Sequence, residues 1–160
     1  MDRVYWDSVC FLGWLLDEPD KVDGCEEVLT EAEDGKLQIV TSALTIAEVL
    51  AIRWQPKIPK DRRATVETFF KKDFILVRGI TRKTAEAARD LVWDAGIKPK
   101  DAIHVAAALD AKVPMLHTFD QGLINASRKV GGVPTLVIAK PHVVSPRLKL
   151  QVGLADEDRL

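Results

Sequence analysis

The sequence has few cysteines, no long apolar run and no excess of basic charge. Its two cysteines, Cys10 and Cys25, do not form a CxxC pair, so we expect buried, reduced thiols rather than a disulfide framework. No apolar run approaches the roughly 20 residues that a membrane-spanning helix needs. The N-terminal residues lack the basic and apolar regions of a signal peptide. We therefore expect a cytoplasmic protein that has no membrane partner.

The net charge of −1 gives the chain no overall positive field that would attract nucleic acid. A chain of this kind that bound RNA would depend on local basic patches and on metal ions. The main basic cluster surrounds two prolines and consists of Arg53, Lys57, Lys60, Arg62 and Arg63. It is either a solvated helix face or a wall for an RNA backbone, with Trp54 stacking on bases. A third alternative is that Trp54 and Ile58 form an apolar surface for a partner helix.

Short apolar runs alternate with helical patterns along the whole chain. The runs expected to form strands are rich in Val, Ile and Leu and fall at 4–6, 37–40, 74–77, 114–118 and 135–138. Helices are expected at 8–16, 21–32, 41–54, 60–71, 82–95, 100–111 and from 121 to about 131. This pattern is typical of a parallel sheet with helices on both faces. It predicts an α/β fold with one domain at 1–144 and a weakly structured tail at 145–160.

Three aspartates fall where expected strands end or expected helices begin. Asp7 directly follows the first strand, Asp120 follows the fourth after Phe119, and Asp101 lies in the first turn of a helix. Each carboxylate has a simple explanation, because acids are common at helix starts. In a doubly wound sheet, however, ligands bind outside the carboxyl ends of the strands. The same three side chains are therefore expected to face one crevice.

Glu48 lies in the middle of its expected helix, so capping does not explain it. It shares a helix face with Leu44 and Ile52, which places a carboxylate on the apolar stripe. Burial of a carboxylate is costly unless a positive charge compensates it. The compensating group would be a metal ion or a buried ion pair with Arg89 or a lysine. Repulsion among the acids also predicts that Glu48→Gln stabilises the metal-free protein.

Four carboxylates in one crevice form an oxygen-only donor set that suits Mg²⁺ or Mn²⁺. Such a site is suited to activating water and hydrolysing a phosphodiester. A haloacid-dehalogenase-type phosphotransferase would need an aspartate at position 9, where the sequence has Val9. A receiver domain would use Lys140 but would leave Glu48 unexplained, and a dinucleotide site would need GxGxxG after the first strand. A non-catalytic module that binds a metal or a partner's arginine stays open.

The acids and their neighbours resemble the PIN-domain family, and within it the VapC-type toxins of toxin–antitoxin pairs. The matching segments are Tyr5-Trp6-Asp7-Ser8, residues 41–49, residues 100–108 and His117-Thr118-Phe119-Asp120. They occur in the family's order and cover most of residues 4–138. The resemblance places the family's four acids on Asp7, Glu48, Asp101 and Asp120 and its supporting hydroxyls on Ser8 and Thr118.

The resemblance implies a Mg²⁺- or Mn²⁺-dependent endoribonuclease in which the four acids bind metal and carry catalysis. It also implies a homodimer and a small protein antitoxin. An arginine of that antitoxin would bridge the acids, and its helix would bind near Trp14, Trp54 and Ile58. His104 lies one helical turn after Asp101. It would contact RNA, orient an acid or simply make a local hydrogen bond.

Overall fold

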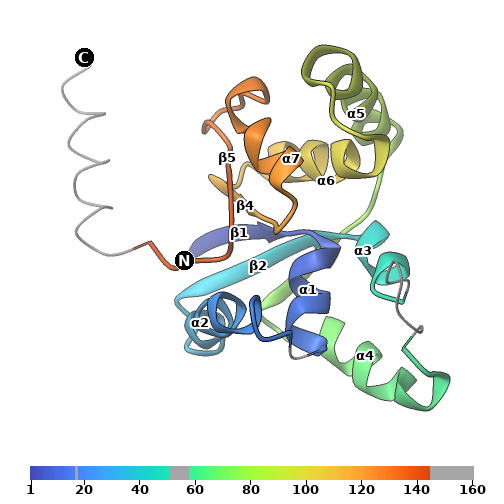
Figure 1. Ribbon diagram of the computed structural model, residues 1–160, viewed down its shortest axis with the longest axis vertical. Helices are drawn as coiled ribbons and strands as arrows, with labels where there is room; N and C mark the ends of the chain where they lie inside the picture. The colour runs from blue at the N-terminus through green and yellow to red at the C-terminus, as the bar shows by residue number, and fades with distance from the viewer. Residues whose placement is uncertain (17, 51–57, 145–160) are drawn as a thin grey trace.

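The structure, a computed structural model, describes residues 1–16, 18–50 and 58–144. Its centre is a parallel sheet with the strand order β3-β2-β1-β4-β5. The strands are β1 (Asp2–Trp6), β2 (Leu37–Ser42), β3 (Ile75–Arg78), β4 (Met115–His117) and β5 (Val137–Ala139). Helices cover both faces of this sheet (Figure 1), which confirms the predicted α/β class.

The helices fall into two groups, one on each face of the sheet (Figure 1). On one face lie α1 (Ser8–Leu15), α2 (Val22–Glu33) and α4 (Arg63–Phe70). On the other lie α5 (Arg82–Ala95), α6 (Pro99–Asp110) and α7 (Gln121–Asn125). The short helix α3 (Ala43–Glu48) follows β2 at the carboxyl edge of the sheet. None of the helices in the described ranges is long and apolar enough to cross a membrane.

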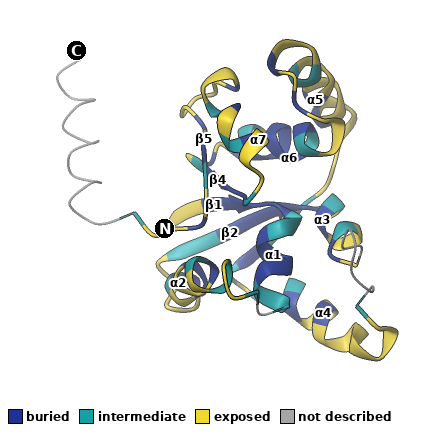
Figure 2. Ribbon diagram, viewed as in Figure 1, coloured by how far each residue is buried: buried dark blue, intermediate teal, exposed yellow. Residues whose placement is uncertain are grey.

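Each face of the sheet has its own apolar core, because neighbouring strand residues point to opposite sides. In β1, Val4 and Trp6 pack in the cluster with α1, α2 and α4, whereas Tyr5 packs in the cluster with α5 and α6. Figure 2 shows that the central strands are buried between these layers. Burial on both faces explains why the strands were continuous apolar runs in the sequence.

Most predicted elements are confirmed, and the differences lie at their ends. Helix α5 has the predicted bounds, since Thr81 forms a capping box with Thr84 and Gly96 adopts a left-handed conformation at φ 66°. Strand β2 is two residues longer than predicted because Thr41 and Ser42 continue the pairing with β3. The prediction of one helix over 41–54 is wrong, because α3 ends at Glu48 and a turn follows.

Two other helices are shorter than predicted. The segment expected as one helix from residue 60 begins with a 3-10 turn at Lys60–Arg62 before α4. The last predicted helix is divided into α7 and a 3-10 turn at Ser127–Lys129. The predicted tail at 145–160 lies outside the described residues, so the domain boundary stays a prediction.

Candidate metal and active site

The candidate crevice lies at the carboxyl ends of β1 and β4. These strands are neighbours, yet the chain leaves β1 toward β2 on one side and β4 toward β5 on the other. Adjacent strands whose connections depart in opposite directions open a crevice where ligands bind. Asp7 follows β1, and Asp120 follows β4 after two intervening residues. The topology therefore brings the first and the last of the predicted acids to one edge.

Asp7 and Asp120 both cap helices, as their positions in the sequence suggested. Oδ1 of Asp7 accepts hydrogen bonds from the backbone N–H groups of Val9 at 3.1 Å and Cys10 at 3.2 Å. Oδ1 of Asp120 accepts one from the backbone N–H of Leu123 at 2.8 Å. Asp7 is buried, whereas Asp120 lies exposed at the rim. Capping fixes each carboxylate in place and does not exclude a second role.

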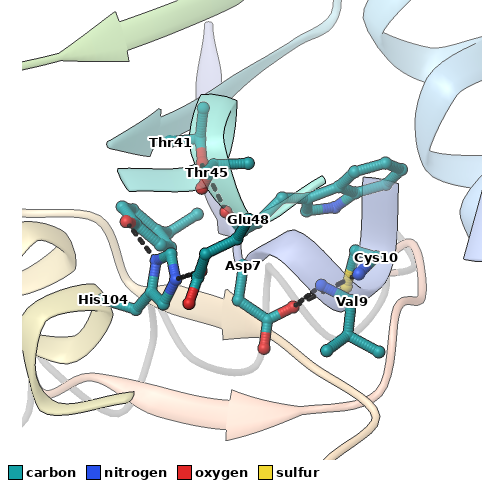
Figure 3. A network of polar contacts seen from close by, with 9 residues as sticks. Asp7, Val9, Cys10, Thr41, Thr45, Glu48 and His104 are labelled. Atoms are coloured by element: carbon teal, nitrogen blue, oxygen red, sulfur yellow. Dashed lines mark hydrogen bonds and ion pairs between the residues drawn. The ribbon is translucent and has the colours of Figure 1, made fainter. Parts of the chain in front are cut away.

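Two buried threonines hold Glu48 near Asp7. Thr41 Oγ1 donates to the carbonyl oxygen of Trp6, the last residue of β1, at 2.8 Å. Thr45 of α3 hydrogen-bonds to the same Thr41 oxygen at 2.7 Å. This pair of contacts ties α3 to the end of β1. Figure 3 shows Glu48 and Asp7 extending in the same direction from their separate elements.

The partner of Glu48 is His104, one turn after Asp101 on α6. Nε2 of His104 lies 2.7 Å from Oε2 of Glu48, and the Glu48 side chain is only 16% exposed. The sequence correctly indicated a compensated, largely buried glutamate. The suggested partner Arg89 is wrong, because Arg89 donates to Asp90 and lies over the ring of Trp93.

The environment of Glu48 favours its charged form. Burial raises the pKa of Glu48, but the hydrogen bond and the charge of His104 outweigh this effect. The Ser8 hydroxyl and the Lys100 ammonium also lower it, and the net pKa lies below the ordinary 4.5. The Glu48 anion is therefore stabilised in the fold. This finding reverses the expectation that Glu48→Gln stabilises the metal-free protein.

The two aspartates nearest the centre of the site behave in the opposite way. Burial raises the pKa of Asp101, and the negative charges of Asp120, Asp7 and Glu48 raise it further. Burial likewise raises the pKa of Asp7, against the opposing effects of His104 and the Thr118 hydroxyl. The charges of the other three predicted acids, Asp7, Glu48 and Asp120, therefore all act on Asp101. The Ser8 hydroxyl acts on Glu48 and the Thr118 hydroxyl acts on Asp7, and their supporting role stays a prediction.

The chemistry of this donor set fits a hard divalent cation. All four candidate ligands are carboxylates, and Mg²⁺ and Mn²⁺ prefer oxygen ligands. Within the described ranges, however, no three His, Cys, Asp or Glu side chains lie close enough to hold an ion as they stand. The acids form an open arrangement, not a closed cage.

Histidine 104 does not belong to an RNA-binding surface, so that alternative is wrong. Its side chain is 2% exposed and lies between Tyr5 and Glu48. The alternative in which it orients an acid agrees with these contacts. The side chain of His117 is buried in the core: Trp6 Nε1 donates to its Nδ1 at 3.1 Å, and burial and His142 lower its pKa to about 3.

Only part of the predicted basic wall lies in the described residues. Lys60, Arg62 and Arg63 are exposed at the start of α4, and Arg63 forms an ion pair with Glu67. Arg53, Trp54 and Lys57 lie outside the described residues. Trp14 is half-buried and stacks on Phe69 at 4.7 Å between ring centroids. It is therefore less accessible to a partner helix than expected.

Two residues of the site were missed in the sequence. Tyr5 appeared to be an ordinary strand residue, but its hydroxyl lies 2.9 Å from Nδ1 of His104. Lys100 appeared to be a surface lysine, but its charge lowers the pKa of Glu48. The signal for Tyr5 was its hydroxyl group, a polar group within an otherwise apolar run of the strand. Lys100 gave no distinguishing signal beyond its position directly before Asp101.

Comparisons with known proteins agree with this architecture. A family model described as "PIN domain" matches residues 4–129, whereas no curated protein matches the chain. Among solved structures, the chain is similar to one described as "Toxin-antitoxin complex from Klebsiella pneumoniae". The identity is 17% and the TM-score 0.55, over 88% of this chain and 99% of that chain.

A second similar structure is the Mycobacterium tuberculosis protein VapC20, described as a "Sarcin-Ricin loop cleaving toxin". The identity is 12% and the TM-score 0.60, over 77% of this chain and 94% of that chain. Identities this low establish a common fold and nothing about activity. The family match covers most of the chain and all four acids, and PIN domains generally use divalent metals. The chain therefore belongs to the PIN domain family.

Proposed function

We propose that the chain is a Mg²⁺- or Mn²⁺-dependent endoribonuclease and the toxin of a toxin–antitoxin pair. The observation that carries this proposal is the placement of the acids: Asp7 and Asp120 follow the neighbouring strands β1 and β4, and Glu48 contacts His104, one turn after Asp101 on α6. A fold gains little from four mutually repelling carboxylates unless a cation joins them. The similarity to two structures described by their toxin function supports the toxin part.

The four acids would hold the ion through carboxylate oxygens that capping does not use. When bound, a divalent ion lowers the pKa of a water molecule and offsets charge on the phosphate. The chain itself fixes the acids beforehand, because backbone N–H groups hold Asp7 and Asp120 and an imidazole holds Glu48. Preorganised groups of this kind stabilise developing charge without reorganising during the reaction.

Lys100 would bind the RNA backbone at this crevice. Its side chain is exposed, and it makes no ion pair with any described residue. It directly precedes Asp101, and its charge reaches Glu48. An ammonium group there would attract a phosphate toward the acids and reduce their repulsion with it. The distant basic cluster at the start of α4 would contribute less.

The partners proposed are an RNA substrate, a small protein antitoxin and a second copy of the chain. An antitoxin that inserts an arginine would neutralise the acid crevice, since a guanidinium fork bridges two carboxylates. Co-purification with the product of a neighbouring small gene, followed by a cleavage assay of the complex, tests this part. A partner that binds and leaves cleavage undiminished would remove the antitoxin from the proposal and keep the nuclease.

The decisive experiment is cleavage of RNA by the purified chain with and without EDTA. We expect cleavage with Mg²⁺ or Mn²⁺, loss in EDTA, and recovery when Mn²⁺ is restored. The Asp7→Asn variant, purified in parallel, should stay inactive throughout and thereby exclude a contaminating nuclease. Metal binding without cleavage of any RNA would favour the non-catalytic alternative, in which the crevice holds an ion or a partner's arginine.

A further inference from the structure

A row of three hydrogen-bonded side chains leads from inside the sheet to the acid crevice. The Tyr5 hydroxyl lies 2.9 Å from Nδ1 of His104, and Nε2 of His104 lies 2.7 Å from Oε2 of Glu48. The three residues come from β1, α6 and α3, which are far apart in the sequence. Figure 3 shows the imidazole of His104 beside the carboxylate of Glu48, joined by a dashed line.

The direction of these hydrogen bonds follows from which atoms carry protons. A tyrosine phenol carries its proton at neutral pH, so the Tyr5 O–H is available as a donor. If Tyr5 donates to Nδ1, the proton of the neutral imidazole lies on Nε2. If the imidazole is charged, Nε2 carries a proton as well. In both cases Nε2–H donates to Glu48 and holds one carboxylate oxygen.

The imidazole has little freedom to move. His104 is 2% exposed and Tyr5 is fully buried, and their rings meet edge to face at 5.8 Å between centroids. Glu48 itself is the last residue of a six-residue helix, with a turn directly after it. A long side chain at the end of a helix depends on its hydrogen-bond partners for its orientation. The orientation of the carboxylate therefore depends on the histidine more than on α3.

We propose that Tyr5 and His104 are positioning residues that fix the Glu48 carboxylate for metal binding. Backbone N–H groups hold the carboxylates of Asp7 and Asp120, whereas the Glu48 carboxylate is held by the imidazole of His104. This inference rests on the proposed metal-dependent function, since it assigns a support to one of the proposed ligands. Support of a ligating side chain by a further hydrogen bond typically changes metal affinity or activity about 10–100-fold.

Two substitutions of His104 separate its two contacts. An asparagine amide occupies the place of Nδ1, so His104→Asn keeps a partner for Tyr5 and loses the donor to Glu48. A glutamine amide reaches the place of Nε2, so His104→Gln keeps the donor to Glu48 and loses the contact with Tyr5. Both variants bury an amide in the same position, so a purely structural role for His104 would affect them alike.

The measurement is Mn²⁺ affinity of the RNA-free chain by titration calorimetry, with thermal melting in EDTA as the check on folding. We expect His104→Asn to bind Mn²⁺ about 10-fold more weakly or worse, and His104→Gln to stay within a few-fold of wild type. In RNA cleavage, His104→Asn should lower kcat and leave KM for RNA unchanged. The exposed His142→Asn variant is the matched control and should bind Mn²⁺ as wild type does.

Tyr5→Phe tests the end of the row that lies inside the sheet. It also keeps the proposal testable if His104→Asn does not fold. In the wild-type background it should weaken Mn²⁺ binding, because the imidazole loses the contact that orients it. In the His104→Gln background it should leave Mn²⁺ affinity unchanged, because no Nδ1 is present. Equal affinities in the wild type, Tyr5→Phe and His104→Asn proteins would overturn the proposal.

The outcomes also separate this inference from the proposed function. A chain that shows the expected ranking of Mn²⁺ affinities and cleaves no RNA would keep the positioning role and refute the ribonuclease. A wild-type chain that binds no Mn²⁺ would overturn the positioning role together with the metal site. Cleavage that needs Mn²⁺ but is unaffected by His104→Asn would refute the positioning role alone.

Discussion

Carboxylates on the β2–α3 side of the crevice and those on the β1–α6 side differ in electrostatic character. Glu48, on the first side, has a hydrogen-bond donor of its own, and its pKa is lowered. On the second side the pKa values are raised: burial raises that of Asp7, and burial together with the charges of Asp120, Asp7 and Glu48 raises that of Asp101. The chain thus stabilises the charged form of Glu48 by itself. The charged forms of Asp7 and Asp101 are unfavourable until a cation binds.

This contrast shows which acids the fold supports and which acids a ligand must support. A carboxylate with a fixed donor stabilises the protein whether or not a cation is present. A carboxylate among like charges costs stability that only a cation or a proton recovers. The β1–α6 side should therefore respond most strongly to metal, to pH and to neutralising substitutions.

The largest effect should follow from removing a charge on the β1–α6 side. We expect Asp101→Asn to lower the rate of RNA cleavage at least ~10²-fold, the effect of losing one electrostatic stabiliser. Asp110→Asn, at the other end of the same helix and paired with Arg78, is the matched control and should cleave at the wild-type rate. An Asp101→Asn variant of full activity would remove this residue from the site.

The next effect is stabilisation by metal. Mn²⁺ at 100 times its dissociation constant should stabilise the fold by about 2.7 kcal/mol, which raises the Tm of a chain of this length by roughly 5–10 °C. Differential scanning fluorimetry with and without Mn²⁺ measures the shift, and Asp101→Asn should lose most of it. An equal shift in Asp101→Asn would show that the ion binds elsewhere.

In the metal-free protein, the two sides should respond to neutralisation with opposite signs. Asp101→Asn should raise the free energy of unfolding by roughly 0.5–1 kcal/mol, a modest gain because water screens a partly exposed group. Glu48→Gln should lower it by about 1 kcal/mol, because the charge-assisted hydrogen bond with His104 is lost. Urea unfolding in EDTA measures both changes. The same sign in both variants would refute the contrast between the sides.

The stabilities of the same two variants, relative to the wild-type protein, should also depend on pH. Because the pKa of Asp101 is raised above 3.8, its contribution to stability is complete below pH 3.8 and lost as pH rises through the folded pKa. Because the pKa of Glu48 is lowered below 4.5, its contribution is complete above pH 4.5 and lost as pH falls. The advantage of Asp101→Asn should therefore grow on raising the pH, and the disadvantage of Glu48→Gln should shrink on lowering it.

The smallest effect concerns the cations around the crevice. Lys100→Gln should reduce the dependence of log KM for RNA on log salt concentration by about one, the value for one phosphate contact. Lys60→Gln, in the exposed 3-10 turn before α4, removes the same charge and should change this slope less. Cleavage assays at several salt concentrations measure both. A larger change in Lys60→Gln would restore the basic wall that was expected around residues 53–63.

The fold was predictable because its signals are local. Thr81 and Gly96 mark the two ends of α5, and their capping and left-handed geometry are properties of those residues alone. The three aspartates were predictable for the same reason, since each follows a strand or begins a helix. Glu48 was identified by its position on the apolar stripe of an expected helix that in the structure already ends at Glu48, so the residue was found although its helix was predicted too long.

The parts that the sequence did not predict depend on contacts between distant segments. The partner of Glu48 is His104, 56 residues away, and one sequence offers many cations at that distance, so Arg89 appeared equally reasonable. The hydroxyl of Tyr5 contacts His104 across 99 residues. The end of α3 was mispredicted because no glycine or proline follows Glu48 until Pro56. Tertiary contacts, not helix propensity, decided these features.

The strand order also fixes when the crevice exists during synthesis. The central strand β1 is made first, but one of its two neighbours, β4, ends 111 residues later at His117. A nascent chain that has emerged only as far as α6 contains Asp7, Glu48 and Asp101 but has no fourth strand against β1. The ribosome must therefore release nearly all of the domain before its acids share one edge. A growing chain that has emerged only as far as α6 therefore has no complete crevice.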